Sequence, residues 1–260
     1  MKRKTTQLRP DGLRGSLRAL VGGALVAGAA LAAPAQAGVI TFEGAFGPTG
    51  HGDAVQQAGY EIGFFSNVPG STSDVAVGLF ADGSDSANNC LGNTCLAGDI
   101  STYYQALNDS YLDIVATNGG SFSIKGFDAG FLGSAATSEN PDGLSYPAIP
   151  GLLLVQGFMA DGSSSYETYQ LSGLTSGTNN FSFGRFAPSA AFSSLQFVEV
   201  AIFGYACRAD GSCQAFQTDR GQFGIDNIVL ADASEVPEPS SALLLGLGLI
   251  GLAARTRRKT

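Results

Sequence analysis

Ser121-Phe122-Ser123-Ile124-Lys125 alternates polar with apolar residues, and Asn180-Phe181-Ser182-Phe183-Gly184 shows the same alternation further along the chain. This pattern is typical of a β-strand with one buried face, because successive side chains of a strand point to opposite sides of the sheet. No long segment has the 3.6-residue apolar period of an amphipathic helix. The chain is therefore predicted to be an all-β protein.

Similar segments bounded by Gly, Pro, Asn, Asp or Ser extend this prediction to most of the chain. Strands are expected at residues 39–42, 75–80, 111–116, 121–127, 152–158, 168–171, 180–186, 195–203 and 223–230. One short helix is expected at 101–108, where Ser101 would cap it. The simplest arrangement is an antiparallel β-sandwich, jelly-roll or immunoglobulin-like, with the two ends of the domain close together.

The first 37 residues have the three parts of a secretory signal peptide. A cationic segment is followed by an apolar segment at 19–33 and by the small-residue site Ala35-Gln36-Ala37. We expect signal peptidase to cut there, so that the mature chain begins at Gly38. The alternative is an uncleaved membrane anchor.

The C-terminus has a second three-part segment. Val236-Pro237-Glu238-Pro239-Ser240 precedes an apolar run at 241–254, and four cations follow within 255–259. The prolines favour extended backbone, and the basic end would stay cytoplasmic while the apolar run enters the membrane. The run is short for a transmembrane helix, so a buried C-terminal helix is the alternative.

This tail resembles the PEP-CTERM sorting signal of exported bacterial proteins, which the membrane transpeptidase exosortase processes. By that resemblance Pro237, Glu238 and Pro239 form the sorting motif, and the apolar run forms a hydrophobic sorting helix. The chain then divides into a signal peptide (1–37), a β-sandwich ectodomain (38–235) and a sorting signal (236–260). It would be anchored transiently in the inner membrane of a Gram-negative-type bacterium, and then delivered to the cell surface or the extracellular matrix.

The charge of the ectodomain limits its partners. Of the 14 Lys and Arg residues in the chain, the ectodomain keeps Lys125, Arg185, Arg208 and Arg220, whereas it keeps all but two of the 22 acids. So negative a surface repels nucleic acid and favours divalent cations. Nucleic-acid binding is thus excluded as a function.

The four cysteines form two local pairs, Cys90 with Cys95 and Cys207 with Cys213. In an exported chain such pairs predict disulfides, although three pairings are formally allowed. A four-thiolate zinc site is the alternative, but its usual spacing is tighter.

A structural calcium ion is the one cofactor that the sequence suggests. Glu43 follows the first strand, and Asp226 and Asn227 lie in the last. The sequences around these residues resemble the first and last strands of jelly-roll carbohydrate-binding modules, in which acids at the two ends of the domain share Ca²⁺. The resemblance implies Glu43 and Asp226 as ligands, with Asn227 as a further one.

Catalytic machinery is not expected. His51 is the single histidine, and neither a GxSxG elbow nor an HExxH motif occurs. Paired carboxylates of a matrix polysaccharide hydrolase remain the alternative, since such an enzyme needs only two acids at a set separation.

Tyrosines are the expected ligand contacts, because the chain has no tryptophan. Tyr103, Tyr104, Tyr166 and Tyr169 are the candidates for an exposed platform. The stretches ITFEG, STYYQALND, FDAGFLG, GFMADGS and QFGIDNIVL also resemble a group of PEP-CTERM proteins associated with exopolysaccharide, biofilm or floc. We therefore expect a non-catalytic surface or matrix protein in contact with exopolysaccharide, and an inert coat protein is a further alternative.

Overall fold

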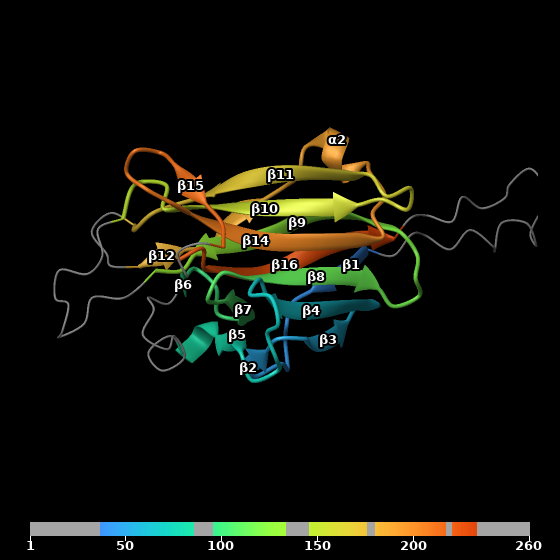
Figure 1. The fold of residues 1–260 in the computed structure, drawn as a ribbon, viewed down its shortest axis with the longest axis horizontal. Coiled ribbons are helices and arrows are strands. Elements are labelled where there is room, and N and C mark those ends of the chain that lie inside the picture. Colours follow the sequence, from blue (N-terminus) through green and yellow to red (C-terminus); the bar gives the residue numbers. More distant parts are fainter. Residues whose placement is uncertain (1–36, 86–95, 134–145, 176–179, 217–219, 233–260) are drawn as a thin grey trace, which may run out of the picture. The chain divides into compact units, whose positions relative to one another are not determined.

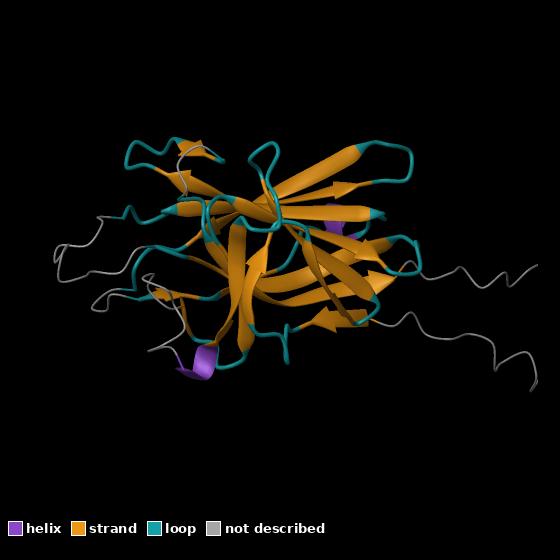
Figure 2. Cartoon of the chain, turned by 60° about the horizontal axis from the view of Figure 1, so that its bottom comes forward, coloured by secondary structure: helices purple, strands orange, loops and turns teal. Residues whose placement is uncertain are grey.

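The computed structural model describes residues 37–85, 96–133, 146–175, 180–216 and 220–232. Nearly all regular structure in these residues is β-strand, arranged as two large antiparallel sheets that pack as a sandwich (Figures 1 and 2). The helical elements described are the single turns η2 (Gly83–Asp85) and α2 (Ala190–Ser193). The predicted fold class is confirmed.

One sheet, called sheet A below, contains the strands from both ends of the described chain. Its order is β13 (Gly184–Phe186), β9 (Phe122–Phe131), β16 (Phe223–Asp232), β7 (Thr102–Ala106), β5 (Ala76–Asp82) and β2 (Gly47–Gly50). The first strand, β1 (Ala37–Ile40), pairs with β16, and Ala37 lies opposite Ala231. The two ends of the domain are therefore neighbours, as expected.

The other sheet, sheet B, runs from top to bottom of Figure 1. Its order is β11 (Ser164–Leu171), β10 (Gly151–Phe158), β14 (Glu199–Cys207), β8 (Ser110–Ala116), β4 (Tyr60–Ser66) and β3 (Asp53–Gln57). The short strand β15 (Cys213–Gln214) extends the edge of β14. Burial alternates strictly along β8, so one face of sheet B lines the core and the other faces outward.

A small parallel pair, β6 (Leu96–Ala97) with β12 (Phe181–Ser182), covers part of the outer face of sheet A. Glycines make this close approach geometrically feasible. A Cβ at Gly130 would lie 2.7 Å from Leu96 and 2.8 Å from the Ser182 carbonyl oxygen. The outer face of sheet A is consequently buried at this point, which explains why Tyr103 on β7 is only 1% exposed.

Aromatic rings join the two sheets across the core. Phe64 of β4 stacks on Tyr104 of β7 with ring centroids 4.3 Å apart, and Phe80 meets both rings edge-on or tilted. Phe127 of β9 meets Tyr169 of β11 in the same way at 5.0 Å. Buried aromatic pairs contribute about 0.5–1.5 kcal/mol beyond their area. The aromatic core therefore fixes how the sheets lie on each other.

The prediction of a helix at 101–108 is wrong, because this segment forms β7. Its two neighbours, β5 and β16, take up its backbone hydrogen bonds, and Tyr103 to Ala106 are buried on both faces. A strand covered on both sides shows no alternation, so the segment carries no period-2 signal. The strands β2, β3 and β4 also went unpredicted, and the strand expected at 195–203 is displaced to Glu199–Cys207.

Replacing Phe64 by alanine should lower the free energy of unfolding by about 3–5 kcal/mol, since Phe64 is fully buried and stacks on Tyr104. Phe46→Ala is the matched control, because Phe46 is 88% exposed, and it should change stability by less than about 0.5 kcal/mol. Urea unfolding of the purified protein measures both. Equal losses in the two variants would contradict this account of the core.

Candidate functional site

A buried acid, Asp226 on β16, is the centre of the candidate site. Its residue is fully buried, and its Oδ2 accepts a hydrogen bond of 2.9 Å from the hydroxyl of Ser101. Ser101 precedes β7, the strand beside β16, and its hydroxyl also contacts Oδ1 of Asp99. The sheet pairing thus brings Asp99, Ser101 and Asp226 together from segments far apart in the sequence.

The side chains of Asp99, Ser101 and Asp226 offer one hydroxyl proton to two carboxylates, although the backbone N–H of Ser101 also donates to Oδ1 of Asp99 at 2.8 Å. The Ser101 hydroxyl has one proton but faces two carboxylates, so it can satisfy only one of them at a time. The second oxygen of Asp226, Oδ1, is buried and has no hydrogen-bond partner among the described residues. An unsatisfied buried carboxylate is costly. The cluster is therefore chemically complete only with an additional proton or a cation.

The titration of Asp226 reflects this environment. Burial, with a further contribution from the nearby Asp99 carboxylate, raises the pKa of Asp226 to about 8 against the lowering effect of hydrogen bonds from the Asn227 backbone and Ser101. At pH below 8 and without a cation, the proton is the species that completes the cluster.

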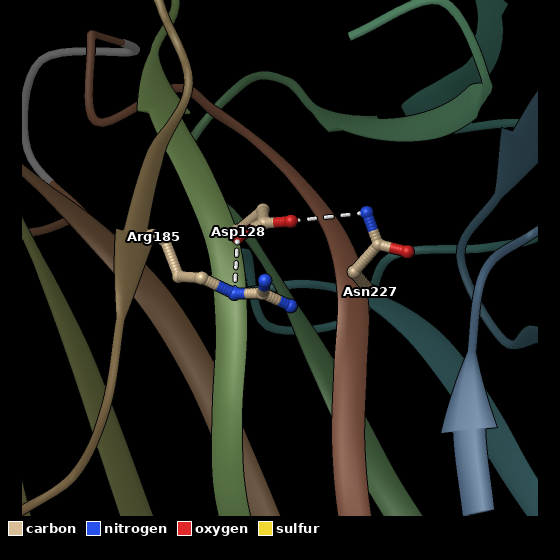
Figure 3. A network of polar contacts seen from close by, with 3 residues as sticks. All are labelled: Asp128, Arg185 and Asn227. Carbon is tan, nitrogen blue, oxygen red and sulfur yellow. Dashed lines mark hydrogen bonds and ion pairs between the residues drawn. The ribbon is translucent and has the colours of Figure 1, made fainter.

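Of the predicted calcium ligands, Asp226 is the centre of this cluster and Glu43 borders it. Glu43 is exposed, and its Oε1 accepts a hydrogen bond of 3.1 Å from the backbone N–H of Thr102, directly after Ser101. Asn227 lies elsewhere, because its Nδ2 donates to Oδ2 of Asp128 at 3.0 Å (Figure 3). The Arg185 side chain forms an ion pair of 3.4 Å with the other oxygen of Asp128.

The backbone at Asn227 explains this separation. Asn227 has a φ of +50°, and the pairing of β16 with β9 shifts register between Asp226 and Val229. Such a β-bulge turns consecutive side chains in new directions. The bulge directs Asp226 into the buried cluster and Asn227 toward Asp128. The sequence predicts a regular strand here, so it does not reveal this separation.

Within the described ranges, no group of three or more His, Cys, Asp or Glu side chains lies close enough to hold a metal. The oxygens of Asp99, Ser101 and Asp226 are nevertheless of the kind that Ca²⁺ prefers, and calcium also accepts backbone oxygens and water. The orphaned oxygen of Asp226 is the observation that fits a cation.

One of the two predicted disulfides is confirmed. Cys207 and Cys213 are bonded across the β14–β15 hairpin. A pocket of about 360 Å³ lies at this hairpin, lined by Ala206, Cys207, Arg208, Gln214 and Arg220. The prediction for Cys90 and Cys95 lies outside the described residues, as do Pro237, Glu238 and Pro239 of the sorting motif.

The single histidine is arranged unlike a catalytic base. Nδ1 of His51 accepts a hydrogen bond of 2.9 Å from the backbone N–H of Ser66, and its ring packs edge-on against Phe65. A neutral imidazole that accepts at Nδ1 carries its proton on Nε2. With Nδ1 engaged by a backbone N–H, His51 is arranged differently from a triad histidine, whose Nδ1 donates to a carboxylate.

The tyrosines expected to form a platform are mostly buried. Tyr103 and Tyr104 are 1% and 0% exposed, so their prediction as an exposed pair is wrong. Tyr169 is half-buried and donates to Glu167, whereas Tyr166 is 65% exposed on the outer face of β11. Alternation along residues 164–171 separates the two, since they differ by an odd number of positions.

The stability of the protein should fall as pH rises from about 4 to about 8 in the presence of a chelator. Asp226 has a raised folded-state pKa, so the folded state binds more protons than the unfolded chain in that interval, and stability is greatest below it. Asp226→Asn should flatten this profile, while Asp161→Asn, in an exposed turn, should keep it. Melting temperatures of the wild-type protein and both variants across this pH range measure the profiles. A wild-type profile that rises with pH would contradict the assignment.

Comparisons with known proteins give one informative match. Residues 235–259 match the PEP-CTERM protein-sorting motif. No curated protein matches the chain. Among the described residues no helix is long and apolar enough to cross a membrane.

Two solved structures have a distant likeness to the chain. The first is TmCBM61 in complex with β-1,4-galactotriose, at 8% identity and a TM-score of 0.29 over 67% of this chain and 88% of that one. The second is the enzymatically active domain of tailspike protein 4 of bacteriophage CBA120, at 12% identity and a TM-score of 0.23 over 59% of this chain and 21% of that one. Scores this low carry no argument about function. The protein is thus characterised by its tail: it carries a PEP-CTERM sorting motif, which implies an exported protein that exosortase sorts.

Proposed function

We propose that the protein is a non-catalytic component of the cell surface or extracellular matrix that contacts exopolysaccharide. The match of residues 235–259 to the PEP-CTERM motif carries this proposal, because it implies export and passage through the membrane before processing. The exported ectodomain is a strand-rich sandwich with a strongly acidic sequence. Its sparse cations favour a neutral partner over an anionic one.

The arrangement of His51 supports a non-catalytic role, since its Nδ1 is already engaged by a backbone N–H. One observation favours the hydrolase alternative. Burial, and then the charge of Glu199, raise the pKa of Asp113 to about 6. A glycosidase uses two carboxyl groups with different pKa values as its acid and its base. In the hydrolase alternative, Asp113 and Glu199 would be that pair. The length of the polymer after incubation therefore has to be part of the test.

A structural calcium ion at Asp99, Ser101 and Asp226 belongs to the same proposal. The cluster has two carboxylates and a hydroxyl at one point, and a buried oxygen that lacks a partner among the described residues. Glu43 borders it through Thr102. A cation would supply the positive charge that these oxygens lack, and would fasten the loop before β7 to the last strand.

Calcium should raise the melting temperature of the wild-type protein by about 5–10 °C at a concentration about 100-fold above Kd. Asp226→Asn should remove this shift because it removes a central charged ligand. Asp161→Asn is the control, since Asp161 accepts only from Ser163 in an exposed turn, and it should retain the shift. Calorimetry with calcium and with a chelator measures it. An unchanged wild-type melting temperature would overturn the calcium assignment.

The wild-type protein should be retained by the exopolysaccharide of the producing organism, more strongly with calcium than with a chelator, and should leave the polymer length unchanged. Cosedimentation measures retention, and size-exclusion chromatography of the polymer measures its length. Shortening of the polymer would instead establish the hydrolase. Absence of retention would leave an inert coat protein.

A further inference from the structure

The outer face of sheet B carries a continuous row of aromatic side chains. Phe65, Tyr111 and Phe203 are directly opposite one another on β4, β8 and β14. Phe65 and Tyr111 are stacked, with ring centroids 5.4 Å apart. All three rings are partly exposed, whereas their chain neighbours Phe64, Leu112 and Ile202 are buried in the core.

Two further rings extend this row into a ridge. Phe216, which follows β15, packs against Tyr111 and lies 4.9 Å from Phe203 by ring centroids. Tyr205 stacks beside Phe203 at 5.7 Å. We call these five partly exposed rings, Phe65, Tyr111, Phe203, Tyr205 and Phe216, the aromatic ridge. Contiguous apolar side chains at a surface are a feature of binding sites.

Hydrogen-bonding groups lie in the next row of the same face. Asp113 follows Tyr111 by two residues on β8, and its neighbours across the sheet are Gly63 and Ala201. Neither neighbour carries a polar side chain, and the Phe65 ring lies over Gly63, where a Cβ would be 2.5 Å from it. Gln156 and the 65% exposed Tyr166 continue the row on β10 and β11. The polar row therefore runs beside the ridge.

Asp113 is suited to accept hydrogen bonds from a ligand. Its Oδ1 is buried and has no partner among the described residues, and burial together with Glu199 raises the pKa of its carboxyl. Because Oδ1 is closed to solvent, a ligand hydroxyl would reach it only after the partly exposed Asp113 side chain rotates, and it would then supply the missing donor. Ring faces of the ridge carry negative charge density, and they attract the polarised C–H groups on the flat side of a sugar ring.

The charge of this face selects among polymers. The outward positions of the five strands β4, β8, β14, β10 and β11 include Glu61, Asp113 and Glu199, and in these strands no Lys or Arg occurs. These acids would repel an anionic polymer, and the five strands offer no cation to pair with its carboxylates or sulfates; Arg208 and Arg220 lie instead at the pocket of the β14–β15 hairpin. A neutral chain rich in hydroxyl groups meets neither obstacle.

From these observations we propose that the aromatic ridge, with Asp113, Gln156 and Tyr166 beside it, binds a neutral polysaccharide chain. This inference rests on the proposed function and names the surface and the polymer class. The chain would lie across strands β4, β8 and β14, with sugar rings on the aromatic faces and hydroxyl groups at the polar row. Neither the cluster of Asp99, Ser101 and Asp226 nor His51 belongs to the polar row.

Affinity electrophoresis of the purified protein tests this inference. The gels contain a soluble β-glucan, a galactan or a mannan as neutral polymers, or alginate as an anionic one. The wild-type protein should be retarded in at least one neutral gel and not in alginate. Tyr111→Ala, Phe203→Ala and Asp113→Asn should each weaken binding on the order of tenfold. Phe46→Ala, an exposed aromatic elsewhere, should bind as the wild type does.

The variants' folding and the oligomeric state need separate measurements. Far-UV circular dichroism shows whether each variant is folded, and NMR titration of the wild-type protein with a retarding glycan should shift backbone amides of β8 and β14 independently of any substitution. No retardation in any neutral gel, retardation in alginate, or shifts confined to other strands would each overturn the inference. A wild-type dimer that Phe203→Ala dissociates would also overturn it, and would assign the ridge to a second copy of this chain.

The outcomes separate this inference from the proposed function. If the organism's own exopolysaccharide retains the protein but the ridge variants bind it equally well, the proposed function is supported and the assignment of the ridge as the binding site is wrong. If neutral glycans bind at the ridge but the organism's own polymer does not retain the protein, the ridge is a binding site and the proposed matrix function is wrong.

Discussion

The contact between Phe64 and Tyr104 is the constraint on which the rest of the described fold depends. Tyr104 lies on β7 in the middle of sheet A, and its ring reaches Phe64 of sheet B as well as Phe42 and Phe80. Its hydroxyl meets the Thr49 hydroxyl on β2 at 3.1 Å. A Cβ at Gly78 would overlap this hydroxyl, so the neighbouring strand needs glycine there. One ring thereby orders both sheets, and the place of β7 beside β16 brings Ser101 to Asp226.

The cluster around Asp226 adds a cost that this core has to offset. A buried carboxyl with an unsatisfied oxygen destabilises the folded state, and the Asp99 charge increases the penalty. An apolar residue at this position of β16 would avoid the cost. In our proposal this carboxyl binds a proton or a cation, which the contacts of Ser101 and Thr102 would hold between the last strand and the start of β7.

The sequence alone identified strands that turn residues bound clearly. β8, which alternates, and β9, which is buried on both faces, were both predicted within a few positions. β7 was mistaken for a helix because Tyr103 and Tyr104 are both buried, one under β6 and β12 and the other in the core. Asp226 was singled out from its position in the last strand. Asp99 was missed, because only the pairing of β7 with β16 brings it near, and no local pattern encodes that pairing.

The aromatic ridge illustrates a different limit. Alternation in β8 shows that Tyr111 and Leu112 point to opposite faces, but it does not tell which face is covered. Hydrophobicity alone would place the larger aromatic ring inside, whereas the core accepts Leu112 and Ile114 because sheet A already contributes large rings. The rings of the ridge are thus not needed to fill the core. Their alignment across β4, β8 and β14, beside an acid flanked by Gly63 and Ala201, is what the proposed ligand on the outer face would explain.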